Sequence, residues 1–176
     1  MTDQPKKHPI AKKKTTSWGG VAHWYDTMLA GDDTYQARVI LPNILRAMAI
    51  KKGEKVLDLA CGQGFFTQAF FQEGASATGV DLGKQLILIA KKHSSKEIQY
   101  FAQSAEDLSI FQDGSFEKIA IVLSIQNIEA PHKVFKECAR VLVPGGKMFI
   151  VLNHPAFRVP KASAWGYDEE TKTQYR

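Results

Sequence analysis

The sequence predicts an α/β fold built on a doubly wound parallel sheet. Three observations support this prediction: short apolar strands alternate with helical patterns, a glycine-rich turn follows the first strand, and the run from Ile119 to Leu123 is apolar at every position. A run that is buried on both faces is typical of a central parallel strand. The predicted strands cover residues 55–60, 75–81, 98–102, 116–124 and 147–152.

The helices expected between these strands follow from apolar residues at three- and four-residue spacing. Pro42 should kink or restart the first helix, and Pro131 suits the first turn of the last one. Pro144-Gly145-Gly146 should break that last helix. The predicted helices cover residues 35–50, 65–72 and 84–92 and begin again at Pro131. The side chains expected to face inward on the last two are Leu86, Ile89, Ala90, Val134, Cys138 and Val141.

The composition fits one globular domain. Of the 176 residues, 44% are hydrophobic, which suffices for a sizeable core and argues against a wholly disordered chain. The net charge of +5 is unevenly placed, because residues 1–17 hold five lysines and one aspartate. The remaining residues are close to neutral. We therefore expect residues 1–17 to be a solvated basic tail, and a nucleic-acid partner is disfavoured.

Cysteine and histidine usage excludes several kinds of site. The two cysteines form no disulfide framework or zinc cluster, and the five histidines show no paired ligand spacing, so no metal is expected. No apolar run approaches the roughly 18 residues of a membrane helix. The first residues lack the apolar stretch of a signal peptide, so we expect a cytoplasmic protein with no membrane partner.

The glycine-rich turn after the first strand is the main candidate site. It reads Val56-Leu-Asp-Leu-Ala-Cys-Gly-Gln-Gly64, and its glycines let a ligand approach the backbone. The helix that follows offers free N–H groups to an anion. Asp81 ends the second strand, where a carboxylate can accept hydrogen bonds from both hydroxyls of an adenosine ribose. These features fit any adenosine-type cofactor.

Two other nucleotide-binding classes are weighed against this pattern. A nicotinamide-dependent dehydrogenase is the main rival, but Thr67 stands where its third glycine is needed. None of the tyrosines is followed by lysine four positions later, as a short-chain dehydrogenase would require. A P-loop is excluded because no Gly-Lys-Ser/Thr follows the glycines.

Three motifs in order resemble the class I S-adenosylmethionine-dependent methyltransferases. The segment from Val56 to Gly64 resembles their first motif, Val80-Asp81 their acidic second motif, and the segment from Arg140 to Lys147 the turn before their fifth strand. Tyr25-Asp26 with Tyr35 resembles the upstream segment that covers the cofactor or substrate. The resemblance implies a Rossmann-like core that binds S-adenosyl-L-methionine and methylates an acceptor, which we expect to be a small molecule.

The resemblance also implies a role for individual residues. Asp58 orders the glycine turn and, directly or through water, the methionine amino group, while Asp81 holds the ribose. Ser124 and Ile125 face the sulfonium. Ser104 stands where many relatives have an aspartate that accepts from the adenine amino group, so Glu106 or Asp107 could take over that contact. The implied cofactor residues are Asp58, Ala60, Cys61, Gly62, Gly64, Asp81, Leu82, Ser104, Ala105, Ser124 and Ile125.

Candidate catalytic residues follow the fourth and fifth strands. Gln126 and Asn127 could face the acceptor, and His154 could act as a base if the acceptor is a hydroxyl or a carbon acid. The segment from Asn153 to Phe157 only partly matches the Asn-Pro-Pro-aromatic motif of amino-group DNA methyltransferases. It also follows the fifth strand rather than the fourth, which again disfavours nucleic acid as the acceptor.

The end of the sequence suggests an incomplete sheet. The methyltransferase sheet has seven strands, but only 24 residues follow Leu152, and they do not resemble two more strands. We therefore expect the sheet to lack its last two strands, with an exposed fifth strand that could drive self-association. A non-catalytic cofactor-binding remnant is the alternative outside enzymes. The expected regions are a tail (1–17), a helical cap (18–52), a cofactor-binding core (53–153) and a C-terminal extension that is truncated relative to the family (154–176).

Overall fold

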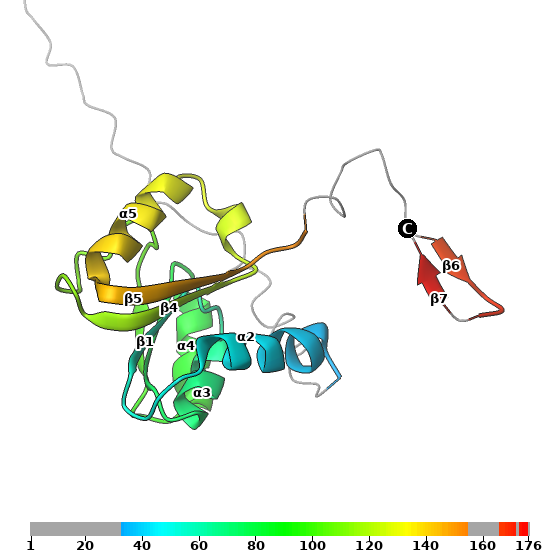
Figure 1. Cartoon of the computed structure of the whole chain (residues 1–176), viewed down its shortest axis with the longest axis horizontal. Coiled ribbons are helices and arrows are strands. Elements are labelled where there is room, and N and C mark those ends of the chain that lie inside the picture. The colour runs from blue at the N-terminus through cyan, green and yellow to red at the C-terminus, as the bar shows by residue number, and fades with distance from the viewer. Residues whose placement is uncertain (1–32, 155–165, 172, 176) are drawn as a thin grey trace, which may run out of the picture.

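A five-stranded parallel sheet forms the centre of the computed structural model, which describes residues 33–154, 166–171 and 173–175. The strand order is β3-β2-β1-β4-β5, so the order reverses between β1 and β4 (Figure 1). The predicted doubly wound parallel sheet is therefore confirmed. Its strands are β1 (Lys55–Leu59), β2 (Ser76–Asp81), β3 (Gln99–Ala102), β4 (Phe116–Val122) and β5 (Leu142–Val151).

Helices cover both faces of this sheet (Figure 1). One face packs against α2 (Leu41–Met48), α3 (Phe65–Gln72) and α4 (Lys84–His93), and the other against α5 (Pro131–Val141). Strand β4 contributes to the core on both faces of the sheet. Ala120 belongs to the cluster that includes α2, α3 and α4, and Ile119 belongs to the cluster that includes α5. Burying an isoleucine side chain such as that of Ile119 contributes about 1.5–3 kcal/mol to the free energy of folding. The consecutive apolar residues of β4 therefore hold the two layers together.

The first predicted helix is divided at its proline. A short π-helix, η2 (Gln36–Ile40), precedes α2, and Pro42 lies in the first turn of α2. A proline is tolerated there because the first helical N–H groups have no partner within the helix. Ala49, with a φ of 45°, ends the helix in a left-handed conformation. The prediction that Pro42 restarts the helix is confirmed.

Two details of the predicted elements are wrong. On α4 the residue buried beside Leu86 and Ala90 is Ile87, while Ile89 is only half-buried. Helix α5 ends at Val141, and β5 already begins at Leu142 instead of after the Pro144-Gly145-Gly146 turn. The reason is a register shift, because β5 advances by five residues from Leu142 to Lys147 while β4 advances by two from Phe116 to Lys118. This irregularity accommodates the turn within the strand.

The C-terminal residues contain a hairpin that the sequence did not predict. Strands β6 (Gly166–Asp168) and β7 (Thr173–Tyr175) pair antiparallel in a two-stranded sheet of their own. Within the described residues they do not extend the main sheet, in which β5 pairs with β4 alone. The expected five-strand core is thus confirmed. The expected boundaries of the four regions stay predictions, and the basic tail lies outside the described residues.

Of the helices within residues 33–154, none combines the length and the apolar character that crossing a bilayer requires.

Gly79 in β2 provides a test of how tightly this strand packs against β3 and the turn after β1. A Cβ atom there would lie 2.6 Å from ring carbons of Tyr100 and 2.9 Å from the Cys61 Sγ. We expect Gly79→Ala to lower the free energy of unfolding by about 1–3 kcal/mol, because overpacking forces its neighbours to move. Urea unfolding would measure this, with Ser76→Ala on the exposed end of β2 as the control. Equal stability of the two variants would contradict the packing described here.

Candidate cofactor site

The candidate site lies at the carboxyl ends of β1 and β4, where the strand order reverses. Two non-glycine residues there, Ala60 (φ 59°) and Leu123 (φ 52°), adopt the left-handed conformation. Such strained backbone is concentrated at functional sites, and open α/β sheets bind ligands at this position. These features support the prediction that the ligand site lies at this edge of the sheet.

Asp81 connects the end of β2 with the glycine turn. Its Oδ2 accepts a hydrogen bond from the Gly62 N–H at 2.9 Å, and its Oδ1 accepts one from the Gly83 N–H at 2.7 Å. Burial raises the pKa of the Asp81 carboxyl, and these two donors oppose the rise. Since an ionised carboxylate can accept about four hydrogen bonds, one acceptor position per oxygen remains for a pair of hydroxyls.

Asp58 is held in position by α3. Only 2% of Asp58 is exposed, and its Oδ2 accepts a 2.6 Å hydrogen bond from the Thr67 hydroxyl, which is fully buried. Burial raises the pKa of Asp58 to about 7, the Thr67 hydrogen bond opposes this rise, and the nearby Asp81 carboxylate adds to it. A cationic group beside Asp58 would stabilise its ionised form.

Thr67 is a site residue that sequence reasoning missed. In the sequence it only interrupts a dinucleotide-binding pattern. Its position in the first turn of α3, nine residues after Asp58, is what brings the hydroxyl to the carboxylate. The signal in the sequence was a threonine in the first turn of the predicted helix, at the position where the dinucleotide-binding pattern has its third glycine.

The two glycines of the turn meet different constraints. A Cβ at Gly62 would meet no atom within 4 Å, whereas the space beside Gly64 is filled by the Tyr100 phenol. Both residues have positive φ, 58° and 85°. The Tyr100 hydroxyl lies 2.9 Å from the Ser94 Oγ, which holds the ring beneath the turn. The open face of the turn is therefore at Gly62, where a ligand can approach the backbone.

Cys61 supports the turn through its backbone N–H and not through its thiol. The side chain is buried, and burial raises the pKa of its thiol well above the usual range. Its N–H donates to the Val80 carbonyl at 3.0 Å, which extends the pairing of β1 with β2 by one step. This bond places the turn directly beside the end of β2.

The segment after β3 lies next to Asp81. The Gln103 N–H donates to the Asp81 carbonyl at 3.0 Å, and Ala105 is buried. Glu106 accepts from the Ala130 N–H at 3.3 Å and Asp107 from the Ser109 N–H at 3.1 Å. Both carboxylates therefore bind backbone of this part of the fold, which favours a structural role for them over replacement of a missing adenine contact.

Ser104 and Leu82 also lie on this side of the site. The Ser104 Oγ accepts from the Glu106 N–H at 3.2 Å. Leu82, which follows Asp81, is 37% exposed and so offers an apolar surface next to that residue.

The end of β4 carries an unsatisfied polar atom. The Ser124 hydroxyl is buried and has no hydrogen-bond partner among the described residues. Ile125 beside it is buried. Because a buried hydroxyl without a partner costs free energy, it marks a position that a ligand atom can satisfy. Together with the free acceptor positions of Asp81 and the open face of Gly62, this atom fits a ligand with a ribose and an amino-acid end, as in S-adenosylmethionine.

The candidate catalytic residues lie at the same edge of the sheet. Gln126 and Asn127 belong to the exposed 3₁₀ turn η3 (Ile125–Asn127), and the Gln126 amide donates to the Leu123 carbonyl at 2.7 Å. The Leu123 N–H donates to the Val151 carbonyl at 2.9 Å, so the segments after β4 and β5 start side by side. The exposed His154 follows on the second of these segments. Their catalytic roles stay predictions.

The two tyrosines expected to cover the site are not brought to it by a described contact. Tyr35 begins the helical segment before Pro42 and is 63% exposed. Tyr25 lies outside the described residues. Their roles stay predictions as well.

Asp58 gives the ligand-free protein a pH-dependent stability. Between its ordinary value of 3.8 and its raised pKa of about 7, the unfolded chain releases the proton that the folded chain keeps. The free energy of unfolding should therefore fall as the pH rises, by up to about 1.4 kcal/mol per pH unit. We expect Asp58→Asn to remove this component. Urea unfolding from pH 4 to 8 would measure it, and parallel stability curves for the two proteins would contradict it.

Comparison with known proteins agrees with this geometry. Residues 57–150 match the family described as "Methyltransferase domain". A ubiquinone biosynthesis O-methyltransferase from Xanthomonas oryzae pv. oryzae is 37% identical over 101 residues, which cover 56% of this chain and 42% of that protein. The chain thus spans less than half the length of this curated relative.

Solved structures show the same core. A protein from Pyrococcus horikoshii OT3 superposes with a TM-score of 0.63 at 30% identity, covering 81% of this chain and 70% of that one. An S-adenosylmethionine-dependent methyltransferase from Mesorhizobium loti gives 0.65 at 25% identity, with 81% and 64% covered. The predicted family and its cofactor are confirmed by these matches, and the chain belongs to the class I S-adenosylmethionine-dependent methyltransferases.

Proposed function

We propose that this chain binds S-adenosylmethionine at the carboxyl edge of its sheet and is the donor-binding part of an enzyme that methylates a small molecule. The observation that carries the proposal is the geometry of Asp81, whose two carboxylate oxygens are oriented by Gly62 and Gly83 and keep one acceptor position each. Asp58 and the unsatisfied Ser124 hydroxyl support it from the neighbouring strands.

Different residues along the edge of the sheet would bind different parts of the cofactor. Asp81 would accept the two ribose hydroxyls, and Asp58 would take the amino group, directly or through water. Ser124 lies on the other side of the turn, toward β4, where the reacting methyl group belongs. When bound, S-adenosylmethionine supplies a methyl group already activated on a sulfonium. The protein must therefore mainly orient donor and acceptor and exclude water, which supplies much of the rate.

The acceptor is proposed to be a small molecule with a hydroxyl group. The curated relative is an O-methyltransferase by name, and methyl transfer to a hydroxyl requires a group that takes its proton. His154 is the proposed base, with Gln126 and Asn127 as groups that orient the acceptor. A methyl-transfer assay with wild-type protein and His154→Ala on phenolic and aliphatic hydroxyl compounds tests both parts.

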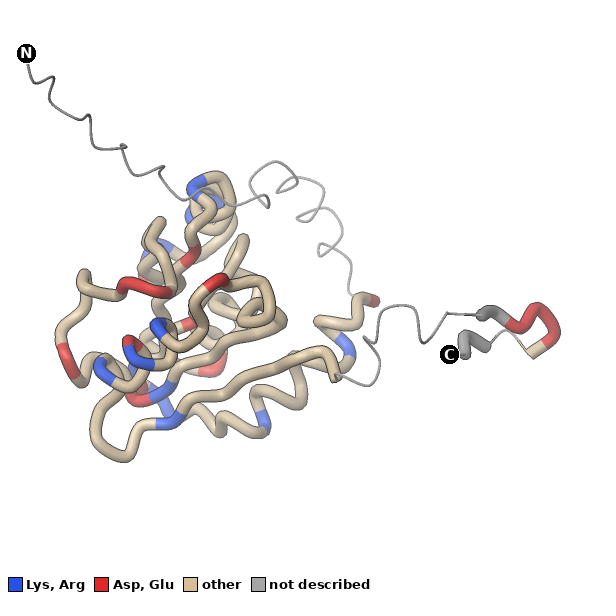
Figure 2. Tube along the Cα trace, turned by 90° about the horizontal axis from the view of Figure 1, so that it is seen from above, with Lys and Arg blue, Asp and Glu red and all other residues tan. Residues whose placement is uncertain are grey.

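Nucleic acid is the less favoured acceptor. Lysine and arginine are interspersed with aspartate and glutamate along the described trace (Figure 2), whereas a nucleic-acid surface would gather the basic residues. Both cysteines are buried and unpaired, which suits the reducing cytoplasm that we propose as the compartment.

Two alternatives have distinct tests. A nicotinamide-dependent dehydrogenase is opposed by Thr67, which is buried against Asp58 where that class needs a glycine. Calorimetry with S-adenosylhomocysteine and with NAD separates the two cofactors. A non-catalytic cofactor-binding protein would bind S-adenosylhomocysteine yet release no methyl group to any acceptor pool.

The edge strand β5 is proposed as a surface for self-association. Among the described residues it pairs with β4 alone, and Met148, Ile150 and Leu152 are 37%, 37% and 53% exposed. We expect concentration-dependent association that Ile150→Lys weakens, because lysine on an edge strand opposes pairing. Sedimentation velocity over a wide range of concentrations would measure it. A wild-type chain that stays monomeric throughout would contradict the proposal.

Asp81 provides the sharpest test of cofactor binding. Asp81→Ala should weaken the binding of S-adenosylhomocysteine by about 1.5–3 kcal/mol, because charge-assisted hydrogen bonds to the ribose are lost. Calorimetry would measure this, with Glu73→Ala at the exposed C-terminal end of α3 as the control. Unchanged affinity in a folded Asp81→Ala protein would remove Asp81 from the site.

A further inference from the structure

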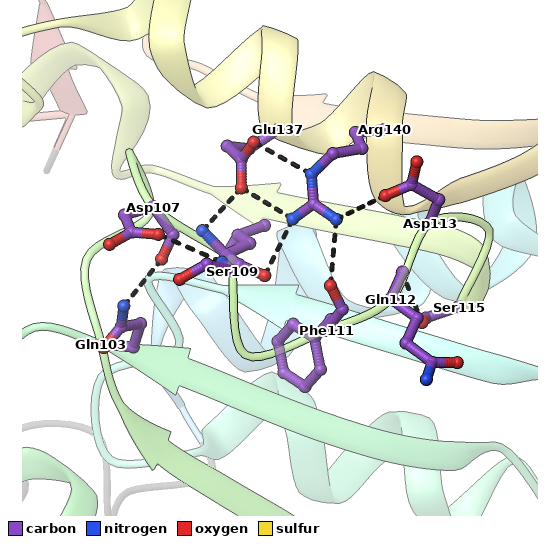
Figure 3. A network of polar contacts seen from close by, with 10 residues as sticks. Gln103, Asp107, Ser109, Phe111, Gln112, Asp113, Ser115, Glu137 and Arg140 are labelled. Atoms are coloured by element: carbon purple, nitrogen blue, oxygen red, sulfur yellow. Dashed lines mark hydrogen bonds and ion pairs between the residues drawn. The ribbon is translucent and has the colours of Figure 1, made fainter.

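The segment between β3 and β4 reaches the candidate site without regular structure of its own. Residues 103–115 contain no helix or strand, so no sheet or helix hydrogen bonds fix their position. Loops of this kind depend on side chains from neighbouring elements to satisfy and hold their backbone. In this protein, those side chains come from α5 (Figure 3).

Arg140 donates with every N–H of its guanidinium, and three of these bonds hold this segment. Its Nη1 donates to the Phe111 carbonyl at 2.9 Å and to Asp113 Oδ1 at 2.8 Å. Its Nη2 donates to the Leu108 carbonyl at 2.9 Å and to Glu137 Oε2 at 2.8 Å, while Nε donates to Glu137 Oε1 at 3.1 Å. All five donors of the planar group are therefore engaged.

Glu137 completes the same contact from the preceding turn of α5. Besides pairing with Arg140, its Oε2 accepts the Leu108 N–H at 2.8 Å. The pair thus binds both the N–H and the carbonyl of Leu108, which is itself fully buried. The hydrogen bonds from Arg140 are the main reason that the pKa of Glu137 is lowered. The two side chains are only partly exposed, at 28% and 18%, so solvent screens the pair less than a surface pair.

The other end of the segment is attached to the site. The Gln103 N–H binds the Asp81 carbonyl, and Glu106 binds the Ala130 N–H. Along the sheet, the glycine turn follows β1, Asp81 ends β2 and Gln103 follows β3. A ligand whose ribose is at Asp81 and whose amino-acid end is at the turn therefore extends its base toward residues 103–106.

We propose that Arg140 and Glu137 are positioning residues that set the base selectivity of the cofactor site by fixing the segment from Gln103 to Asp113. This inference rests on the proposed function, because it takes an adenosine ribose at Asp81. The pair touches no ligand itself and acts through the backbone of Leu108 and Phe111. The segment then keeps its polar groups, backbone included, at fixed positions beside the base.

Lysine cannot replace Arg140 in this arrangement. An ammonium group has three donors around one point, whereas the guanidinium reaches two carbonyls and two carboxylates in one plane. Arg140→Lys keeps the charge but loses this fork. Glu137→Gln keeps the shape, can still accept one hydrogen bond and loses the charge, so it serves as a milder second variant if Arg140→Lys unfolds.

The test compares two ligands that differ only in the base. S-adenosylhomocysteine carries the adenine amino group, and S-inosylhomocysteine carries a carbonyl in its place. We expect wild-type protein to prefer the first, and this preference to fall about 3- to 10-fold in Arg140→Lys, as expected for one hydrogen bond that is no longer well formed. Calorimetry gives both affinities, and hydrogen exchange of the amides of residues 103–114 should become faster.

A control variant separates positioning from stability. Lys118 binds Glu54 and the Ala49 carbonyl at the opposite, amino-terminal edge of the sheet. Lys118→Met should lower the melting temperature without changing the preference between the two bases. If Arg140→Lys and Glu137→Gln also keep the wild-type preference while folded, the positioning role is overturned. If wild-type protein binds neither ligand, the proposed function falls as well, so the two failures are distinguishable.

Discussion

The site depends on the hydrogen bonds that Asp81 makes with three neighbouring segments. Its carboxylate binds the N–H groups of Gly62 and Gly83, and its carbonyl accepts the N–H of Gln103. One residue thereby joins the turn after β1, the end of β2 and the segment after β3. Since parallel strands end at a common edge, a single residue at that edge can set the relative positions of all three through its side chain and its backbone carbonyl. Aspartate suits this place because its two oxygens accept from several N–H groups at once.

This arrangement has an energetic cost that a ligand can offset. Asp58 is buried, Asp81 near it is partly buried, and burial raises the pKa of both carboxyls. Ser124 adds a buried hydroxyl without a partner among the described residues, and Ala60 and Leu123 add strained backbone. Each feature destabilises the empty fold, and each lies within the candidate site. A cation beside Asp58 and a hydrogen-bond partner at Ser124 would remove much of that cost, as expected where function competes with stability.

The parts of the fold that the sequence predicted well are those determined by local chemistry. The uniform apolar run of β4, the glycines after β1 and the proline that begins α2 each limit the backbone through neighbouring residues only. The errors arise where distant segments decide the outcome. β5 begins early because β4 tolerates a register shift opposite it, and Ile87 replaces Ile89 in the core because of the way α4 lies on the sheet. Thr67 and the Arg140–Glu137 pair were missed as site residues for the same reason, since Asp58 and Leu108 are their partners through the fold.

The donor and acceptor sides of the site are built in different ways. The donor side rests on strands that hold one another through buried backbone contacts, and the match to the methyltransferase domain ends at Ile150, within β5. The proposed acceptor side draws on η3 and on residues 152–154 after β5, where Gln126, Asn127 and His154 are exposed and lie outside the strands. A rigid donor side with loops around the acceptor lets one core serve many acceptors, because changes in the loops leave the strands undisturbed. The Arg140–Glu137 pair follows the same logic on the donor side, since it gives an irregular segment the fixed position that a strand would have through its own hydrogen bonds.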